Sequence, residues 1–291
     1  MTMRFSLIVL VLLVGTSFAA SNPLLLSQEL DATYCYEGSA TTMAGDRHVG
    51  SLTEHYADLK YVVSPQVGQK LLWRFGAEWQ RFSFGVPDGV SLPKTLQQIS
   101  AIIGCDYQLA DQWLLRVEVQ PGVYSDFEQV NWHSVDVPVI VGAAYLHNAD
   151  LQWFFGVLMD PRCEYPLLPS VGVRWKFADQ WTLNLQMPTP RLEYEATDNL
   201  KVYLGLGIKV GTFVVNNHFG TDHGLPQLNG ATVDYYEARF GPGVSWKVLP
   251  NVTLEMEGGF VLGRWWDFYD ARLQFASRQA PYVQIACHAR F

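Results

Sequence analysis

Apolar residues occupy every second position over most of this chain, and that alternation limits the fold more than any other feature. In the stretch KLLWRFGAEWQ the odd positions are apolar, whereas the charged residues Lys70, Arg74 and Glu78 fall on even positions. Side chains of a β-strand point alternately to its two faces, so the pattern predicts strands with one polar and one apolar face. It recurs in WLLRVEVQP, LKVYLGLGIKVG, VTLEMEGGFVLG and the closing YVQIACHARF. The sequence therefore predicts an all-β fold.

The first nineteen residues have the features of a secretory signal peptide. Arg4 provides an early positive charge, an apolar run covers residues 5–14, and Ala19 completes a small-x-small cleavage site. That run is shorter than the ~20 apolar residues of a spanning helix, which disfavours the alternative of an uncleaved anchor. We predict that residues 1–19 are removed and that residues 20–291 form a single exported domain.

Short and long connections alternate between the predicted strands. Short turns at one rim and long loops at the other are typical of bacterial outer-membrane barrels. We predict a closed, antiparallel, up-and-down transmembrane β-barrel of about fourteen strands, with short periplasmic turns and longer extracellular loops. Twelve strands are the alternative, because ATYCYEG is a weak first strand and QMPTPRLEY makes a cramped hairpin. Short turns are expected near residues 64–68, 109–112, 147–150, 178–180, 197–199 and 249–251, and long segments near residues 84–96, 126–134, 160–168, 212–230 and 264–278.

Composition helps to decide which face of the strands meets lipid. A soluble sandwich would bury the same apolar faces between two sheets, so alternation alone does not separate the two folds. Only 16% of residues are charged and 14% are aromatic, which favours apolar faces toward lipid and polar faces toward the lumen. The net charge of −8 argues against nucleic acid as a partner, because phosphate binding needs clustered Lys and Arg. Tryptophans near strand ends, which suit a membrane interface, are Trp113, Trp153, Trp175, Trp181 and Trp246.

The tetrapeptide ADQW occurs at residues 110–113 and again at residues 178–181, each time between two alternating stretches. Asp tolerates tight-turn backbone and can accept hydrogen bonds from neighbouring N–H groups, while Trp suits the membrane interface. We interpret both copies as turns at the periplasmic rim and not as a motif for chemistry.

The last strand alternates up to the terminal residue, Phe291. This resembles the terminal strand of outer-membrane barrel proteins, and the resemblance implies that Phe291 belongs to the signal read by the barrel-assembly machinery. The stretches VYSDF, VPVIVGAAY, LQWFFGVLMDP and PSVGVRWKFADQWTLNLQMPTPRLEYEATDNLKVYLGLG are also similar, in their order, to a family of Gram-negative outer-membrane β-barrel proteins of unknown function. That resemblance implies the barrel and an outer-membrane location, and it supplies no catalytic residue.

The polar face carries acids and bases in near balance. A ring of one sign would indicate an ion-selective pore. A mixed lining permits two interpretations: opposed charges across a water-filled passage, or salt bridges that hold the interior shut. The candidate lumen-lining residues are Lys70, Arg74, Glu78, Arg116, Glu118, Arg174, Lys176, Lys201, Lys209, Glu237, Arg239, Glu255, Glu257, His288 and Arg290. Glu54, Asp58, Lys60, Asp106 and Arg191 share their phase.

We expect a monomeric outer-membrane barrel that contacts membrane lipids and acts as a passive or weakly selective, porin-like channel for small solutes. The alternative is a closed structural or adhesion barrel that meets partners through its extracellular loops. An outer-membrane enzyme ranks third, and its candidate side chains match no nucleophile or metal motif, so we predict no catalytic site, cofactor or metal. Those side chains are His133, Ser134, Asp136, His218, Asp222 and His223. The disulfide state of the cysteines stays open: they are Cys35, Cys105, Cys163 and Cys287.

Overall fold

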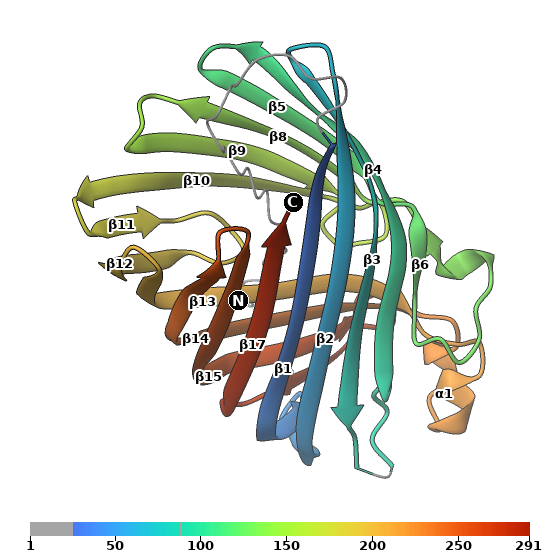
Figure 1. Ribbon diagram of the computed structural model, residues 1–291. Helices are drawn as coiled ribbons and strands as arrows, with labels where there is room; N and C mark the ends of the chain where they lie inside the picture. The colour runs from blue at the N-terminus through green and yellow to red at the C-terminus, as the bar shows by residue number, and fades with distance from the viewer. Residues whose placement is uncertain (1–25, 88) are drawn as a thin grey trace.

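The chain folds into a closed, antiparallel β-barrel of fourteen strands, which confirms the predicted fold class. The structure is a computed structural model that describes residues 26–87 and 89–291. The predicted signal peptide at residues 1–19 lies outside the described residues. Three wall strands are each interrupted once, so seventeen strand segments form the sheet (Figure 1).

The first seven wall strands are β1 (Leu26–Ala44), β2 (Arg47–Val67), β3 (Leu71–Gly85), β4 (Thr95–Ala110), β5 with β6 (Trp113–Val119 and Gly122–Ser125), β7 with β8 (Val135–Asp136 and Val139–Leu146) and β9 (Leu151–Met159). The other seven are β10 (Leu167–Ala178), β11 (Trp181–Asn184), β12 (Arg191–Thr197), β13 (Leu200–Val214), β14 (Thr232–Leu249), β15 (Val252–Phe268) and β16 with β17 (Leu273–Ser277 and Ala280–Arg290).

The last strand pairs with the first and closes the barrel. β17 is antiparallel to β1, with Arg290 opposite Glu29. At the end of this ladder Phe291 and Gln28 exchange two backbone hydrogen bonds, of 2.9 and 2.8 Å. The closing ladder leaves neither strand as a free sheet edge, as a lipid environment requires.

Tight turns join the strands at the rim that carries the C-terminal residue, which is the periplasmic rim of such a barrel. In both ADQW copies the Ala pairs with the Trp across the turn, and a β-bulge lies just before it. The expected bonding of N–H groups by the Asp side chains is not seen, because neither Asp111 nor Asp179 makes a side-chain hydrogen bond with a described residue. The turn at 147–150 differs, since Asn148 Oδ1 accepts hydrogen bonds from Asp150 N (2.9 Å) and Leu151 N (2.8 Å).

The extracellular connections are longer and contain the described helical turns, α1 (Phe219–Asp222), η1 (Trp132–Ser134), η2 (Pro226–Leu228) and η3 (Tyr269–Ala271). Among the described residues, no helix has the length and apolar character needed to cross a membrane. The expectation of a long loop at 264–278 is wrong, because β15 continues to Phe268 and β16 begins at Leu273. Trp266 and Phe268 are buried and extend the inward phase of β15 beyond the lipid-facing region.

The barrel narrows toward its extracellular end. The hairpin of β11 and β12 is short, with strands of four and seven residues. On the extracellular side of this hairpin, β13 lies next to β6 (Figure 1). Val214 pairs there with Ser125, and Asp126 N donates to Val214 O at 3.2 Å. The segments that follow one another round this end are β13, β14, β15, β16, β1, β2, β3, β4 and β6. This smaller ring is close in size to barrels of about eight strands, which are filled by their own side chains.

On the long strands, apolar side chains point outward in one half and inward in the other half. On the periplasmic half of β3, Phe75 is exposed outward and Arg74 is buried inward, whereas farther along Arg81 is exposed and Phe82 is buried. The same strand therefore follows a membrane-barrel pattern in one half and a soluble-barrel pattern in the other. The exposed outward belt of the membrane half includes Leu59, Phe75, Ile103, Val117, Phe155, Val171, Leu204, Val244, Met256 and Ile285.

Candidate functional site

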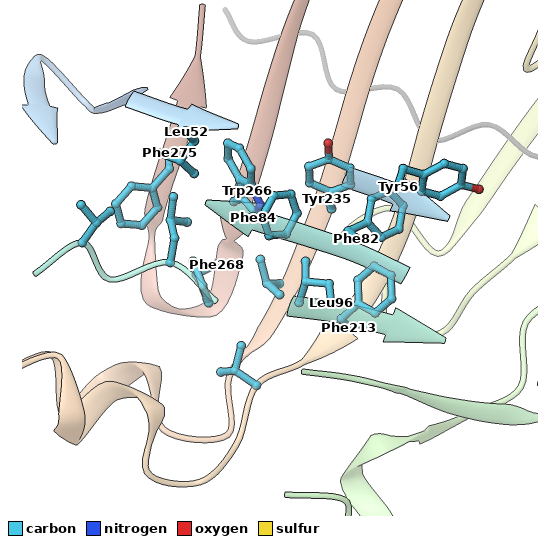
Figure 2. Close-up of a cluster of buried hydrophobic side chains, with 14 of the residues drawn as sticks. Leu52, Tyr56, Phe82, Phe84, Leu96, Phe213, Tyr235, Trp266, Phe268 and Phe275 are labelled. Atoms are coloured by element: carbon cyan, nitrogen blue, oxygen red, sulfur yellow. The ribbon is translucent and has the colours of Figure 1, made fainter. Parts of the chain in front are cut away.

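Aromatic side chains fill the narrowed extracellular end of the lumen (Figure 2). Five of them form what we call the aromatic plug: Phe82 and Phe84 from β3, Phe213 from β13, Tyr235 from β14 and Trp266 from β15. The ring centroids of Phe82 and Tyr235 lie 4.8 Å apart, and those of Phe84 and Trp266 lie 5.2 Å apart. Because β3 pairs with β2 and β4, these contacts reach across the lumen. The aromatic plug therefore closes the lumen on its extracellular side.

Extracellular loops pack over the aromatic plug. Leu92 from the β3–β4 connection and Leu228 from the β13–β14 connection are fully buried in the same cluster. A polar contact holds two of the loops together, since Asp126 Oδ2 accepts hydrogen bonds from Asn216 N at 2.7 Å and from Asn216 Nδ2 at 3.0 Å. The loops thus add to the closure.

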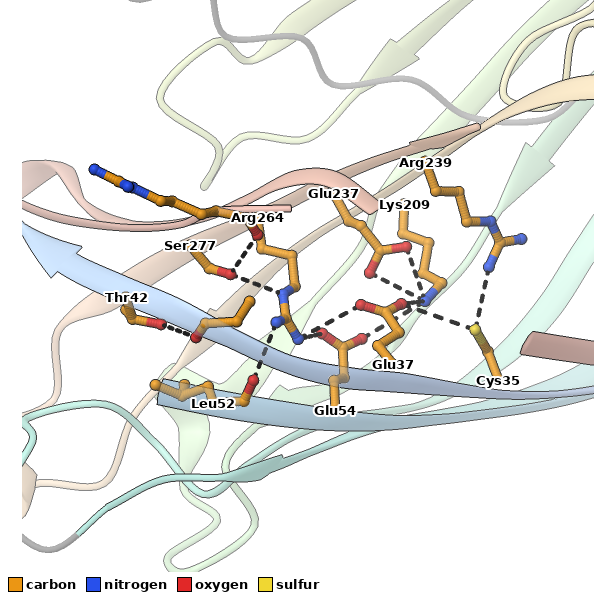
Figure 3. A network of polar contacts seen from close by, with 12 residues as sticks. Cys35, Glu37, Thr42, Leu52, Glu54, Lys209, Glu237, Arg239, Arg264 and Ser277 are labelled. Carbon is orange, nitrogen blue, oxygen red and sulfur yellow. Dashed lines mark hydrogen bonds and ion pairs between the residues drawn. The ribbon is translucent and has the colours of Figure 1, made fainter. Parts of the chain in front are cut away.

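Buried charges border the aromatic plug on its periplasmic side, where Tyr235 OH donates to Glu54 Oε2 and Glu237 Oε2. We call Glu37, Glu54, Lys209, Glu237 and Arg264 the charge layer (Figure 3). Lys209 Nζ lies 2.8 Å from Glu37 Oε1 and 3.0 Å from Glu237 Oε1. It is 3.6 Å from Glu54 Oε1, and Arg264 approaches the same carboxylate to 3.3 Å. Buried charges need such partners, because leaving one of them alone is strongly destabilising.

The charge layer also contains a set of carboxylates that could hold a metal ion. Oxygens of Glu37, Glu54 and Glu237 all lie within 4.8 Å of one another. The Lys209 ammonium, however, already lies within 3.6 Å of each of them, so a metal ion would have to displace it. The arrangement is that of a buried ion-pair network.

Between the charge layer and the periplasmic rim the lumen holds a cavity of about 350 Å³, a size typical of small-molecule sites. Six acids and seven bases line it together with His288, so the lining is mixed in sign. Tyr56 and Phe82 line its extracellular side. The cavity can therefore offer a solute both charged and aromatic contacts.

Most charges of the cavity wall are paired with charges on other strands. Arg74 Nε lies 3.2 Å from Glu118 Oε2, and Arg74 Nη1 lies 3.3 Å from Glu29 Oε1. Arg116 forms a two-pronged contact with Asp106, at 2.6 and 2.7 Å. These pairs hold β1, β3, β4 and β5 together inside the lumen.

The opposite wall is paired in the same way. Arg191 Nη1 lies 3.0 Å from Glu255 Oε2. Asp31 lies between two partners, with His288 Nδ1 at 2.7 Å and Arg290 Nη2 at 2.8 Å. The charges of the mixed lining are thus largely paired, and a cavity remains between them.

The structure places the candidate lumen-lining residues in three groups. The residues that line the cavity are Arg74, Glu78, Arg116, Glu118, Lys209, Arg239, Glu255, His288 and Arg290. Glu237 belongs to the charge layer, and Glu257 is buried where Tyr282 OH donates to it at 2.6 Å.

The remaining four candidates lie outside the cavity. Lys70 is in the exposed turn between β2 and β3, so its expected lumenal position is wrong. Lys176 and Lys201 both pair with Glu195, at 3.5 and 3.0 Å, on strands next to the periplasmic turns. Arg174 is half-buried on β10. Alternation gives the face of a residue but not its depth, which explains these differences.

Four charged residues that the structure brings into the lumen were not predicted from the sequence. Glu29, Asp31 and Glu37 lie on β1, and Arg264 lies on β15. The first three share the odd phase of Thr33 in a strand too polar to give a clear alternating pattern. Arg264 lies where the sequence suggested a loop, beside adjacent aromatic residues that hide the period.

The side chains considered for enzyme chemistry have structural contacts in the loops. His223 Nδ1 hydrogen-bonds to Phe219 O at 2.7 Å, and the two rings lie 4.6 Å apart. Ser134 Oγ accepts a hydrogen bond from Asn131 N at 3.3 Å and caps the η1 turn. No disulfide joins any of the four cysteines in the described part of the chain.

Comparisons with known proteins give structural likenesses and one family match. An outer membrane channel from Pseudomonas putida F1 aligns with a TM-score of 0.48 and 12% identity over 96% of this chain and 100% of that chain. A FadL homologue from Pseudomonas aeruginosa gives 0.45 and 10% over 91% and 90% of the two chains. The NanC porin gives 0.41 and 10% over 89% and 98%. Among curated proteins none matches the sequence. The family model described as Domain of unknown function (DUF6268) matches residues 71–290, and the chain belongs to this family.

Proposed function

We propose that the protein is an outer-membrane channel for small polar solutes whose lumen is closed at rest by the aromatic plug. The exposed apolar belt supports a membrane location, since such side chains are suited to lipid. The lumenal cavity supports passage of solutes, because its polar wall faces a space large enough for them. Hydrophobic constrictions are a known way to gate pores, since water leaves a narrow apolar passage.

The main support for this proposal is that the inward-facing side chains of a single strand change from charged to aromatic along its length. β3 contributes Arg74 and Glu78 to the cavity and Phe82 and Phe84 to the aromatic plug. A barrel that served only as a scaffold has no need of a polar cavity below an apolar core. A barrier above a solute cavity is what a gated channel requires.

Osmotic swelling of proteoliposomes tests the proposal. In arabinose the wild type should swell hardly faster than empty vesicles, because the aromatic plug blocks the passage. The double variant Phe82→Ala with Phe213→Ala should swell at least about tenfold faster, since it removes two rings that meet 5.9 Å apart in the plug. Phe75→Ala is the matched control, because it removes a ring from the lipid-facing side of the same strand, and it should behave as the wild type.

The second candidate function is a closed structural or adhesion barrel, and the dense ion pairing of the lumen favours it. The same assay separates the two. If the double variant is folded, as judged by different gel mobility before and after boiling, and still does not swell, the channel proposal is wrong. Fast swelling of the wild type would equally contradict closure by the aromatic plug.

A further inference from the structure

Two carboxylates on the cavity wall, those of Asp58 and Glu78, have no ion-pair partner among the described residues, and we propose that they bind a small organic cation with an apolar body. The inference rests on the proposed function, because it names the class of solute for the same lumen. It concerns binding, however, and can be tested without transport.

The pairing of the other charges makes these two carboxylates stand out. Glu29, Glu118 and Glu255 each have an arginine within 3.3 Å, and Asp31 has Arg290 at 2.8 Å. Asp58 and Glu78, in contrast, have no cation within ion-pair distance among the described residues, and an amide is their hydrogen-bonding neighbour: Gln80 Nε2 donates to Glu78 Oε1 at 2.9 Å, and Gln80 lies directly opposite Asp58. A carboxylate taken out of water without a cation is costly, so this part of the wall favours a positive ligand.

Lys60 is the cationic side chain nearest to this pair in the strand register. It lies directly opposite Glu78 on the neighbouring strand, two residues from Asp58 on the same face. The register therefore places two carboxylates beside one ammonium group, so this part of the wall is locally richer in acids than in bases. A ligand with a single positive charge would give the second carboxylate a partner.

Unpartnered polar atoms at the cavity wall point to a missing ligand independently of the charge count. Asp58 Oδ1 is buried and accepts no hydrogen bond. Gln284, which is only 6% exposed and lines the same cavity, has an Oε1 atom with no described partner. Buried polar groups in folded proteins are nearly always satisfied by protein, water or ligand, so a hydrogen-bonding solute accounts for these atoms.

The apolar part of the wall selects an organic cation over a bare metal ion. Tyr56 and Phe82 lie one step along the ladder from Asp58 and Gln80, with ring centroids 4.9 Å apart. Ile140 and Ile208 also line the cavity. Aromatic and aliphatic side chains gain from contact with an apolar ligand body, and aromatic rings attract cations. An arylalkylammonium ion combines both features.

Titration calorimetry of the folded full-length protein in detergent tests the inference with three phenyl-bearing probes of similar size. Phenethylammonium should bind, whereas 3-phenylpropionate and 2-phenylethanol should bind at least about tenfold more weakly, because they lack the charge that the carboxylates recognise. Equal binding of the three probes, or preference for the anion, would overturn the inference. So would the absence of phenethylammonium binding up to millimolar concentrations.

Substitutions of the charged side chains test whether phenethylammonium binds at Asp58 and Glu78. Asp58→Asn and Glu78→Gln should each weaken phenethylammonium binding about tenfold, while Lys60→Gln should strengthen it by removing the competing ammonium. The opposite directions exclude simple misfolding as a cause. Glu195→Gln removes one negative charge at the periplasmic rim and should leave binding unchanged. If Lys60→Gln weakens binding or Glu195→Gln matches Asp58→Asn, the cation does not lie at Asp58 and Glu78.

The calorimetric result and the swelling result can fail separately. Binding of the cation by a barrel that never swells would keep this site and reject the channel. Swelling of the plug variant without cation selectivity would keep the channel and reject this site.

Discussion

The contribution of each charged residue of the lumen to stability depends mainly on the partner whose charge it neutralises. Arg74 illustrates this, because its side chain is only 3% exposed and contacts both Glu118 and Glu29. Lys201 at the rim also has a carboxylate partner, Glu195, but its side chain is 38% exposed. Removing a partner from a buried pair leaves an uncompensated charge, whereas exposed pairs contribute little. Two ion pairs of similar distance therefore differ in energy.

Replacing Arg74 by Met should lower the free energy of unfolding by about 3 kcal/mol, because Glu29 and Glu118 would remain buried without their cation. The matched change Lys201→Met should cost less than about 1 kcal/mol. Urea unfolding of the two variants in detergent micelles, followed by tryptophan fluorescence, measures both values. Equal losses would show that the lumenal pairs are as hydrated as those at the rim.

At the scale of elements, the turns at the periplasmic rim are all tight, but they differ in the side-chain hydrogen bonds that support them. The ADQW hairpins have bulged strand ends and no side-chain hydrogen bond from their Asp among the described residues. The 147–150 turn is held by Asn148, whose Oδ1 accepts two backbone hydrogen bonds. The side chain that matters in a turn is thus the one that accepts backbone N–H groups.

Asn148→Ala should therefore destabilise the barrel by about 1 kcal/mol, as expected when backbone donors lose a side-chain acceptor. Asp179→Ala, in the second ADQW turn, should change stability by less than about 0.5 kcal/mol, the usual range for surface substitutions. The urea midpoints of the two variants provide the comparison. A larger loss for Asp179→Ala would mean that its side chain has a role that the structure does not show.

Strand elements also show what the sequence could predict. Alternation places Arg74, Glu78 and Glu118 inward correctly, because period two fixes the face of each residue once one face meets lipid. It does not predict the aromatic plug, since Phe82 and Phe84 share the phase of the charged residues and look like a break in the pattern. Nor does it give the depth of Lys70 or the partners of Arg74, which depend on shear and on strands distant in sequence.

For the molecule as a whole, the barrel has a wide charged half and a narrow apolar half. The wide half has fourteen wall strands, and the contact of β6 with β13 makes the narrow half small enough for side chains to fill. Such a change in circumference along one barrel provides a closed end above a solute cavity. The aromatic plug is therefore expected to close the lumen at the narrow end.

Single-channel recording in a planar lipid bilayer measures directly whether the aromatic plug closes the lumen. The wild type should show no sustained current, because the aromatic plug and the loops above it exclude water and ions. The Phe82→Ala and Phe213→Ala double variant, folded and inserted in the same way, should show stable stepwise currents. A steady ohmic current from the wild type, or silence from the folded double variant, would contradict closure of the lumen by these rings.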